Sequence, residues 1–284
     1  MKKIIVWIGL AVTAVCLYFV LRGLDYGQLL TIIKRTNLWL LCATVALYIG
    51  GYYIRAIRWH YLLKHIKPIE PQALFPYLVM GFMFNNVLPA RAGEFIRAYM
   101  TGTKKGVSRS STFATVVIER VFDGLVMICF FIAGYSAFHF LSAQVSVPPI
   151  KIAGFSLGIK DAVLGFAVIG CAVFAGIFVF MLLLIYRREK TSAFIHGILR
   201  RFPAAISGKA NKLTDTFING LGVLGNAGDV ARVFLLSASA WTVEVVTYWL
   251  MAKAMGISVS FILVCLIMAV SNFAIMAPST SGGV

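Results

Sequence analysis

A short polar segment follows the apolar run FPYLVMGFMF, and its residue types are suited to binding an anion. The segment reads NNVLPARAGEFIR, and its notable residues are Asn85, Asn86, Pro89, Arg91, Gly93, Glu94 and Arg97. A helix that restarts after a proline leaves free backbone N–H groups at residues 90–94, and these groups attract anions together with the helix dipole. The guanidinium groups of Arg91 and Arg97 match phosphate oxygens in geometry.

The two arginines also have a simpler interpretation. Arginine side chains near a membrane surface extend towards water, and Glu94 lies three residues from both Arg91 and Arg97, where it could pair with them. We favour anion binding because two Asn, a Pro, a Gly, a Glu and two Arg coincide within thirteen residues.

A second polar group interrupts the apolar segment VVIERVFDGLVM. Glu119 and Asp123 are four residues apart and share a helix face, and Arg120 precedes Asp123 by three. Charged residues within a membrane span are costly and normally face the protein interior. Two interpretations stay open and are compatible: an ion pair with Arg91 or Arg97 that stabilises the fold, or a direct role in binding ligand or handling protons. Glu244, in WTVEVVTYW, is a further carboxylate that alone is a weak signal.

These residues lie in a chain with the composition of a membrane protein. Of its 284 residues 60% are hydrophobic and 13% are charged, whereas soluble domains carry about 25% charged residues. Apolar runs long enough to span a bilayer cover residues 4–21, 38–54, 124–141, 162–186, 233–252 and 259–277. We therefore predict an all-α polytopic membrane protein with roughly six to eight membrane segments. The first run is interpreted as an uncleaved helix rather than a signal peptide.

The charge pattern predicts the orientation in the membrane. The net charge is +16, but the basic residues lie at the ends of apolar runs, which argues against nucleic acid as a partner. With a cytoplasmic N-terminus, 19 of the 26 Lys and Arg residues fall in cytoplasmic stretches, including residues 55–70 and 91–109. The sequence thus predicts a multi-pass protein of the cell (inner or plasma) membrane.

This orientation constrains the polar segment described first. The apolar run 73–88 lies between two basic stretches that both belong in the cytoplasm, so it cannot cross the membrane once. We predict a re-entrant helical hairpin over residues 72–106, with a turn formed by Asn85, Asn86, Pro89 and Gly93.

The C-terminal segment FILVCLIMAVSNFAIMAPSTSGGV has a related pattern. An apolar run again meets polar and helix-breaking residues, here Asn272, Pro278, Gly282 and Gly283, and it enters from the outer side. Two broken segments that enter from opposite faces indicate an inverted repeat, with a binding site where the breaks meet. We expect a single membrane domain over residues 1–284 that continues beyond Val284 with at least one further helix.

Residues 187–230 form the longest hydrophilic stretch, which we predict to be a cytoplasmic insert of two cationic amphipathic helices lying on the membrane surface. The alternative is a soluble helical hairpin packed under the bundle. The five cysteines are isolated within apolar runs, and the four histidines lack metal-ligand spacing, so we expect no disulfide, metal or cofactor.

Three motifs resemble a known family, the transmembrane region of lysylphosphatidylglycerol synthases, also called flippase-like or UPF0104 membrane proteins. They are N-x-L-P-A-R-x-G-E-x-x-R at residues 86–97, E-R-x-x-D at residues 119–123, and P-x-x-x-G-G at residues 278–283. Ser281 departs from the third motif, where a second proline is common. The resemblance extends over essentially the whole chain.

The resemblance implies a lipid-handling protein that moves or binds an anionic or aminoacylated phospholipid. In bifunctional members a separate soluble domain transfers lysine to phosphatidylglycerol, and no segment of this chain is long enough to be that domain. The alternatives are a phosphatidylglycerol lysyltransferase-type enzyme or a membrane partner of a head-group transferase, a non-transporting scaffold, and an ion channel. Expected partners are a membrane phospholipid, a separate lipid-modifying enzyme and a second copy of the chain.

Overall fold

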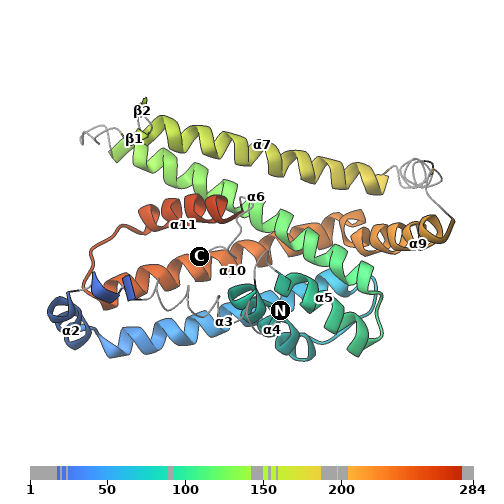
Figure 1. The fold of residues 1–284 in the computed structure, drawn as a ribbon, viewed down its shortest axis with the longest axis horizontal. Helices are drawn as coiled ribbons and strands as arrows, with labels where there is room; N and C mark the ends of the chain where they lie inside the picture. The colour runs from blue at the N-terminus through green and yellow to red at the C-terminus, as the bar shows by residue number, and fades with distance from the viewer. Residues whose placement is uncertain are drawn as a thin grey trace.

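The computed structural model describes residues 18–19, 21–23, 25–88, 92–141, 150–152, 155–157, 159–186, 197 and 204–276. The helices within this part are α2 (Tyr26–Arg35), α3 (Leu38–Leu63), α4 (Pro71–Val87), α5 (Ala92–Lys105), α6 (Arg109–Leu141), α7 (Ile159–Tyr186), α9 (Ala204–Gly220), the 3₁₀ turn η3 (Leu221–Gly225), α10 (Ala227–Ala254) and α11 (Phe261–Met276). Two short strands, β1 (Ile150–Ile152) and β2 (Phe155–Leu157), pair antiparallel between α6 and α7. The described part is therefore almost entirely helical (Figure 1), as the sequence predicted.

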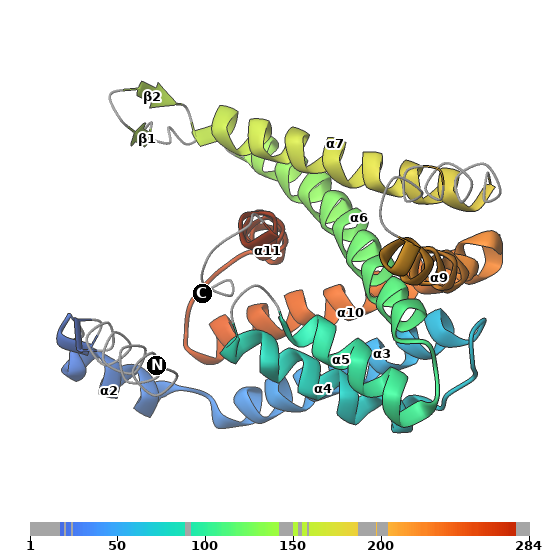
Figure 2. The same ribbon diagram turned by 45° about the vertical axis from the view of Figure 1, so that its right-hand side comes forward.

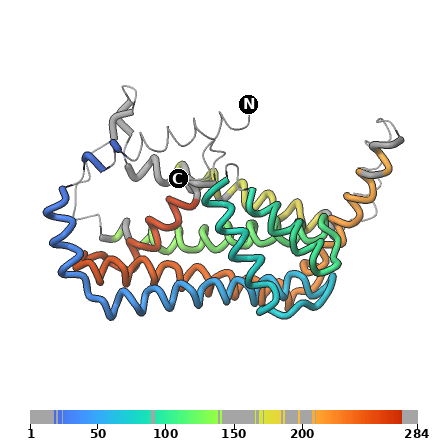
Figure 3. Tube along the Cα trace, turned by 60° about the horizontal axis from the view of Figure 1, so that its bottom comes forward, coloured from blue at the N-terminus to red at the C-terminus, as the bar shows by residue number. Residues whose placement is uncertain are grey.

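Helices α3 and α10 lie side by side along the molecule and form its most extensive helix–helix contact (Figures 1 and 3). They run antiparallel: the Asn37 N–H donates to the Ala254 carbonyl (2.9 Å) at one end, and His65 contacts Asp229 (2.8 Å) at the other. We call these the Asn37 end and the His65 end of the bundle.

Two described helices, α3 and α10, are long and apolar enough to cross a membrane, judged by length and composition alone. Parts of α7 and α11, Val168–Leu183 and Phe261–Asn272, are shorter apolar helices. Five of the six predicted apolar runs lie wholly or almost wholly in helices α3, α6, α7, α10 and α11, whereas the run 4–21 lies almost entirely outside the described residues.

The second run extends further than we predicted. We placed Arg55 and Arg58 in a cytoplasmic stretch, but both are buried inside α3, which continues to Leu63. Partners from other helices offset the charge of each arginine, so these charges do not end the apolar helix. Where the membrane ends along α3 stays a prediction.

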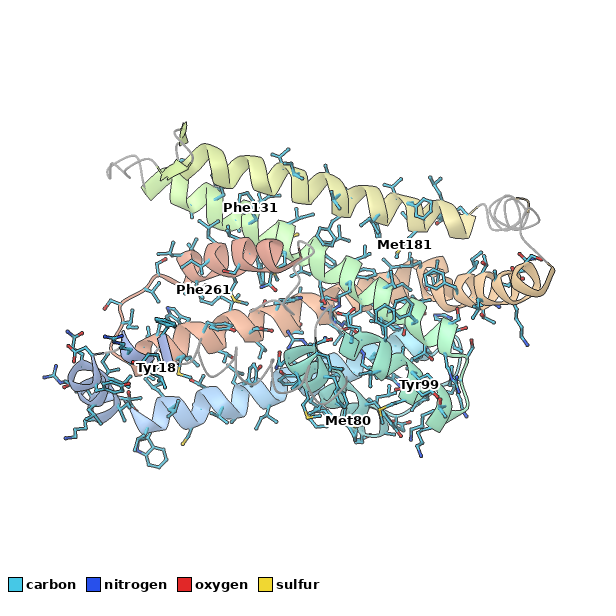
Figure 4. All side chains as sticks on the ribbon, viewed as in Figure 1. Tyr18, Met80, Tyr99, Phe131, Met181 and Phe261 are labelled. Atoms are coloured by element: carbon cyan, nitrogen blue, oxygen red, sulfur yellow. The ribbon has the colours of Figure 1, made fainter. Side chains whose placement is uncertain are left out.

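Helices α4 and α5 form a helical hairpin that packs on α3 and α6 near the His65 end (Figure 2). Figure 4 shows Met80 of α4 and Tyr99 of α5 in the same corner of the molecule. The two ends of the hairpin meet where the Lys67 ammonium donates to the Lys105 carbonyl (2.8 Å). The helical hairpin over residues 72–106 was thus predicted correctly, whereas its insertion in a membrane stays a prediction.

The turn of this hairpin is shorter than predicted. Asn85 and Asn86 belong to the last turn of α4, which the Leu88 N–H closes by donating to the Phe84 carbonyl (2.8 Å), and Gly93 lies in the first turn of α5. Asparagine is tolerated near a helix C-terminus, so these residues did not have to form the turn itself. Pro89 lies outside the described residues.

Two apolar clusters hold the bundle together. One gathers around Trp59, Leu62 and Phe122, and the other around Met127, Trp241 and Leu266. In the second cluster Gly134 of α6 lies so close to α11 that a Cβ there would come within 2.9 Å of the Leu266 Cβ. Helix α6 therefore connects the hairpin to α11.

The second half of the predicted insert folds onto α6. The hydroxyl groups of Ser110 and Ser111 donate to the carbonyls of Leu213 and Thr216 in α9, at 2.9 and 2.6 Å. Ile218 is buried, while Leu213 is 59% exposed. Helix α9 therefore packs on α6, and the choice between helices on the membrane surface and a soluble hairpin packed under the bundle stays a prediction. The first predicted amphipathic helix lies almost entirely outside the described residues.

Candidate functional site

The crossing of α4 and α5 depends on two glycines. A Cβ on Gly93 would lie 2.0 Å from the Gly81 carbonyl oxygen and 2.6 Å from the Asn85 backbone nitrogen. On the other helix, a Cβ on Gly81 would lie 3.0 Å from the Arg97 Cβ. The missing side chains allow the two helices to approach closely and bring Arg97 against α6.

Arg58 of α3 is fully buried at the centre of a network of charged groups. Its Nη1 donates to Asp123 Oδ1 (2.5 Å) and to the Ser237 hydroxyl (2.9 Å), and its Nη2 lies 3.0 Å from Glu119 Oε1. The Trp241 indole N–H adds a hydrogen bond of 2.8 Å to the same Asp123 oxygen. One arginine thus connects helices α3, α6 and α10.

The hairpin contributes Arg97 and Glu94 to this network. Arg97 Nη2 contacts Glu119 Oε2 at 3.1 Å, and its guanidinium group lies over the Trp59 ring, 4.5 Å from the ring centre. Arg120 contacts Glu119 (2.6 Å), Asp123 (3.2 Å) and Glu94 (3.4 Å). Glu119 is therefore shared by three arginines, and Arg120 connects the buried interior to Glu94 at the edge.

We call the six residues Arg58, Glu94, Arg97, Glu119, Arg120 and Asp123 the ionic network. Its three arginines and three carboxylates balance in formal charge among the described residues. A buried charge is tolerated only when it is paired and hydrogen-bonded. Every charge of the ionic network has an opposite charge beside it, although Nε of Arg58, Arg97 and Arg120 lacks an acceptor among the described residues. The six residues join α3, α5 and α6, and the hydrogen bonds of Ser237 and Trp241 add α10.

A second buried ion pair lies one helix turn away. Arg55 of α3 pairs with Glu244 of α10, and its guanidinium group lies 5.3 to 5.7 Å from the ring centres of Tyr52, Phe82 and Trp241. Such contacts between a cation and aromatic faces stabilise a desolvated arginine. We call this unit the aromatic ion pair.

A small hollow of about 170 Å³, including the open space at its mouth, lies between the hairpin and α6. It is lined by Gly81, Phe82, Asn85, Glu94, Arg97 and Arg120. Asn85 Oδ1 and Arg97 Nε are buried atoms without a hydrogen-bond partner. Buried polar groups are nearly always paired, so these atoms indicate a site for a polar ligand or water.

The structure brings most of the predicted site residues together. Asn85, Gly93, Glu94, Arg97, Glu119, Arg120 and Asp123 all lie in or beside the ionic network and the hollow. The expected pairing of Glu119 with Arg97 is present. Asn86 is exposed and does not line the hollow.

Other predicted site residues lie elsewhere or are not described. Asn272 donates to the Met268 carbonyl of its own helix (2.9 Å), and no described contact joins it to the ionic network. Pro89, Arg91, Pro278, Gly282 and Gly283 lie outside the described residues. Within the described part, no group of three or more His, Cys, Asp or Glu is placed to hold a metal ion.

Arg58 was not predicted as a site residue, and Glu244 was considered only a weak signal. Arg55 and Arg58 are three residues apart and share a helix face, and the apolar pattern continues beyond them through Trp59 and Leu62. That continuation was the signal that both arginines lie inside a helix rather than at its end.

Two described helices long and apolar enough to cross a membrane are consistent with a helical membrane protein. Comparison with known families identifies which one: residues 6–284 match the model of the lysylphosphatidylglycerol synthase TM region, and the chain belongs to this family. The resemblance found in the sequence motifs is thereby confirmed.

Individual relatives are distant. Glycosyltransferase AglD of Haloferax volcanii is 24% identical over 299 residues, which cover 100% of this chain and 47% of the relative. The chain thus spans about half the length of that protein. Two UPF0104 membrane proteins of Methanothermobacter thermautotrophicus are 24% and 23% identical, over 86% and 80% of this chain and 70% and 66% of their own lengths. No solved structure matches the chain.

Proposed function

We propose that this protein binds a membrane lipid and moves it between leaflets, with the head group bound at the hollow beside the ionic network. The observation that carries the proposal is the hollow itself, which is lined by Asn85, Glu94, Arg97 and Arg120 within an otherwise apolar bundle. A lipid suits such a site because its acyl chains can stay in hydrocarbon while the head group occupies a polar recess. The proposed substrate is an anionic or aminoacylated phospholipid.

The lengths of α4 and α5 support a re-entrant hairpin. With 17 and 14 residues they extend about 26 and 21 Å, whereas crossing the hydrocarbon core takes about 30 Å. The contact of Lys67 with Lys105 brings both ends of the hairpin to one side of the bundle. The hairpin would therefore enter and leave the membrane at the same face.

Basic residues support a cytoplasmic location for the His65 end. Lys64, Lys67, Lys104, Lys105, Arg109 and Arg232 lie near that end, whereas Lys34, Arg35 and Lys253 lie near the other. Positively charged residues favour the cytoplasmic side of a membrane. Arg58 lies seven residues before His65, about 10 Å along the helix axis, so the ionic network would lie in the cytoplasmic half of the membrane.

The order of helices supports an inverted repeat. The long helix α3 is followed at the His65 end by the hairpin, and the antiparallel helix α10 is followed at the Asn37 end by the short helix α11. Long helices of opposite direction, each followed by a short apolar segment, are expected of inverted-repeat transporters. We propose six to eight membrane segments with a cytoplasmic N-terminus.

Reconstitution tests the proposed function. The protein would be placed in vesicles that contain fluorescent phosphatidylglycerol, and lipid movement would be followed by chemical quenching from outside. We expect faster movement than in protein-free vesicles, and a large loss in Glu94→Gln, which removes the charge at the edge of the network. Glu70→Gln, at an exposed carboxylate before α4, is the matched control. Equal rates with and without protein would refute the proposal.

The name of one relative supports a second candidate, a membrane partner of a lipid head-group transferase. Glycosyltransferase AglD is about twice as long as this chain, so its name describes more than the shared region. A general-base role for Glu119 or Asp123 has little support, because both are held by at least two arginines. Incubation with lysyl-tRNA and phosphatidylglycerol tests catalysis directly, and product formation would favour an enzyme.

A further inference from the structure

The charge balance of the ionic network bears on which part of a lipid the hollow can hold. Three arginines and three carboxylates neutralise one another in the ionic network, so the described residues present no surplus positive charge to the hollow. A phosphate placed there would lie beside Glu94 and would have to displace a carboxylate from its arginine. Burying an uncompensated charge is strongly unfavourable.

The unpaired atoms at the hollow require both a donor and an acceptor. Arg97 is 3% exposed, and within the described part its Nε–H and that of Arg120 have no acceptor. Asn85 Oδ1 is a buried acceptor that receives no hydrogen bond from the described residues. A fully ionised phosphate only accepts hydrogen bonds, so it would leave the asparagine oxygen unpaired. A hydroxyl group donates and accepts, and therefore satisfies both.

We propose that the hollow binds one hydroxyl group of a polyol head group, either glycerol or a sugar, and that any phosphate lies outside it. This inference rests on the proposed lipid-binding function and names the chemical group that the site selects. The enclosed space is small, about 10 Å³, which has room for about one water-sized group, so a single hydroxyl group enters it while the rest of the head group lies at its mouth. Phe82 gives the hollow an apolar wall for the C–H groups of the polyol.

Two matched pairs of lipids test the inference. Phosphatidylglycerol differs from phosphatidic acid by its glycerol, and monoglucosyl diacylglycerol differs from diacylglycerol by its sugar. The full chain would be purified in detergent and incubated with equal amounts of each lipid, and retained lipid would be measured by native mass spectrometry. We expect the polyol member to be retained about tenfold more than its partner in at least one pair, because one additional buried hydrogen bond changes an affinity by about this factor.

Neighbouring asparagines provide a matched pair of variants. Asn85→Ala removes the unpaired acceptor and should abolish the preference for the polyol lipid. Asn86→Ala removes the same side chain one residue later, where it is exposed and away from the hollow, and should retain the preference. Thermal unfolding of both variants shows whether each is folded.

The outcomes separate this inference from the proposed function. A preference within the phosphatidylglycerol pair alone assigns glycerol as the bound group. A preference within the glucosyl pair alone assigns a sugar. Either result supports the inference. Equal retention within each pair, or equal loss of preference in Asn85→Ala and Asn86→Ala, overturns it while lipid binding stands. Retention of no lipid at all overturns the proposed function as well.

Discussion

The two buried charge centres lie one helix turn apart on α3 and are built differently. In the aromatic ion pair, Arg55 has one carboxylate partner, Glu244, and its remaining surroundings include the faces of three aromatic rings. In the ionic network, Arg58 has two carboxylate partners and a hydroxyl, and other arginines share these carboxylates. Trp241 touches both centres, with its ring at Arg55 and its N–H at Asp123.

This difference distinguishes an ion pair that stabilises the fold from a binding site in an apolar bundle. The aromatic ion pair joins α3 to α10, and neither Arg55 nor Glu244 lines the hollow beside the ionic network. The ionic network retains unpaired N–H groups and borders that hollow, so a ligand can exchange contacts with it. Burial of charge alone does not identify a site; spare hydrogen-bonding capacity beside open space does.

The largest effect is expected from Arg58→Met. This change leaves the ionic network with excess negative charge in a fully buried position, which costs about 3–5 kcal/mol of unfolding free energy. Thermal unfolding in detergent measures the loss. Arg58→Met combined with Asp123→Leu restores the charge balance and should recover much of the stability. A double variant no more stable than Arg58→Met would contradict the network.

A smaller but clear effect is expected from Gly93→Ala. The new methyl group would lie 2.0 Å from the Gly81 carbonyl oxygen, so α4 and α5 must separate, at a cost of about 1–3 kcal/mol. The hollow should widen and lipid binding should weaken. Gly50→Ala in α3 is the matched control, since nothing lies within 4 Å of its added Cβ, and it should stabilise the helix by about 0.5–1 kcal/mol. Equal stability of the two variants would exclude the close crossing.

The helical class and the hairpin could be predicted from the lengths of the apolar runs and the positions of the basic residues. An ion pair of Glu119 or Asp123 with Arg91 or Arg97 was one of two open interpretations, because a carboxylate within an apolar span needs a partner; the structure contains the pair of Arg97 with Glu119. The sequence did not predict Arg58 or the pairing of Arg55 with Glu244. Their partners lie 65 and 189 residues away in the chain, and only tertiary packing brings them together. A charged residue near the end of an apolar run predicts a membrane boundary unless such a partner is known.

The comparison of the two centres predicts a modest effect for removing the aromatic ion pair as a whole. Replacing Arg55 and Glu244 together by Met and Leu removes both charges, so stability should stay within about 1–2 kcal/mol of the wild type. Lipid movement in vesicles should also be retained, because neither residue lines the hollow. Glu244→Gln alone leaves Arg55 buried without its counter-charge and should be less stable than the double variant. Loss of lipid movement in the folded double variant would place the aromatic ion pair in the functional site.

The smallest effect is expected at the His65 end, where a third charged contact joins α3 to α10. Asp229 lies 2.8 Å from His65 and 3.2 Å from Arg232, and it occupies the first turn of α10, where a negative charge is favourable. Asp229→Asn should cost about 0.3–1 kcal/mol and leave lipid movement unchanged. Arg232→Gln, at a side chain that is 58% exposed, should cost less still.

Added salt should weaken the contacts of Asp229 more than those of the ionic network. Ions at 1 M shorten the screening length to about 3 Å. The energetic difference between wild type and Asp229→Asn should therefore shrink, because the partners of Asp229, His65 and Arg232, are 33% and 58% exposed. The difference between wild type and Arg58→Met should persist, because Arg58 and its carboxylate partners are all buried. Unfolding of the three proteins at low and high salt measures both differences. If salt reduced both equally, Arg58 would have to be accessible to water, and the ionic network would then be part of an open aqueous path rather than the closed wall of a hollow.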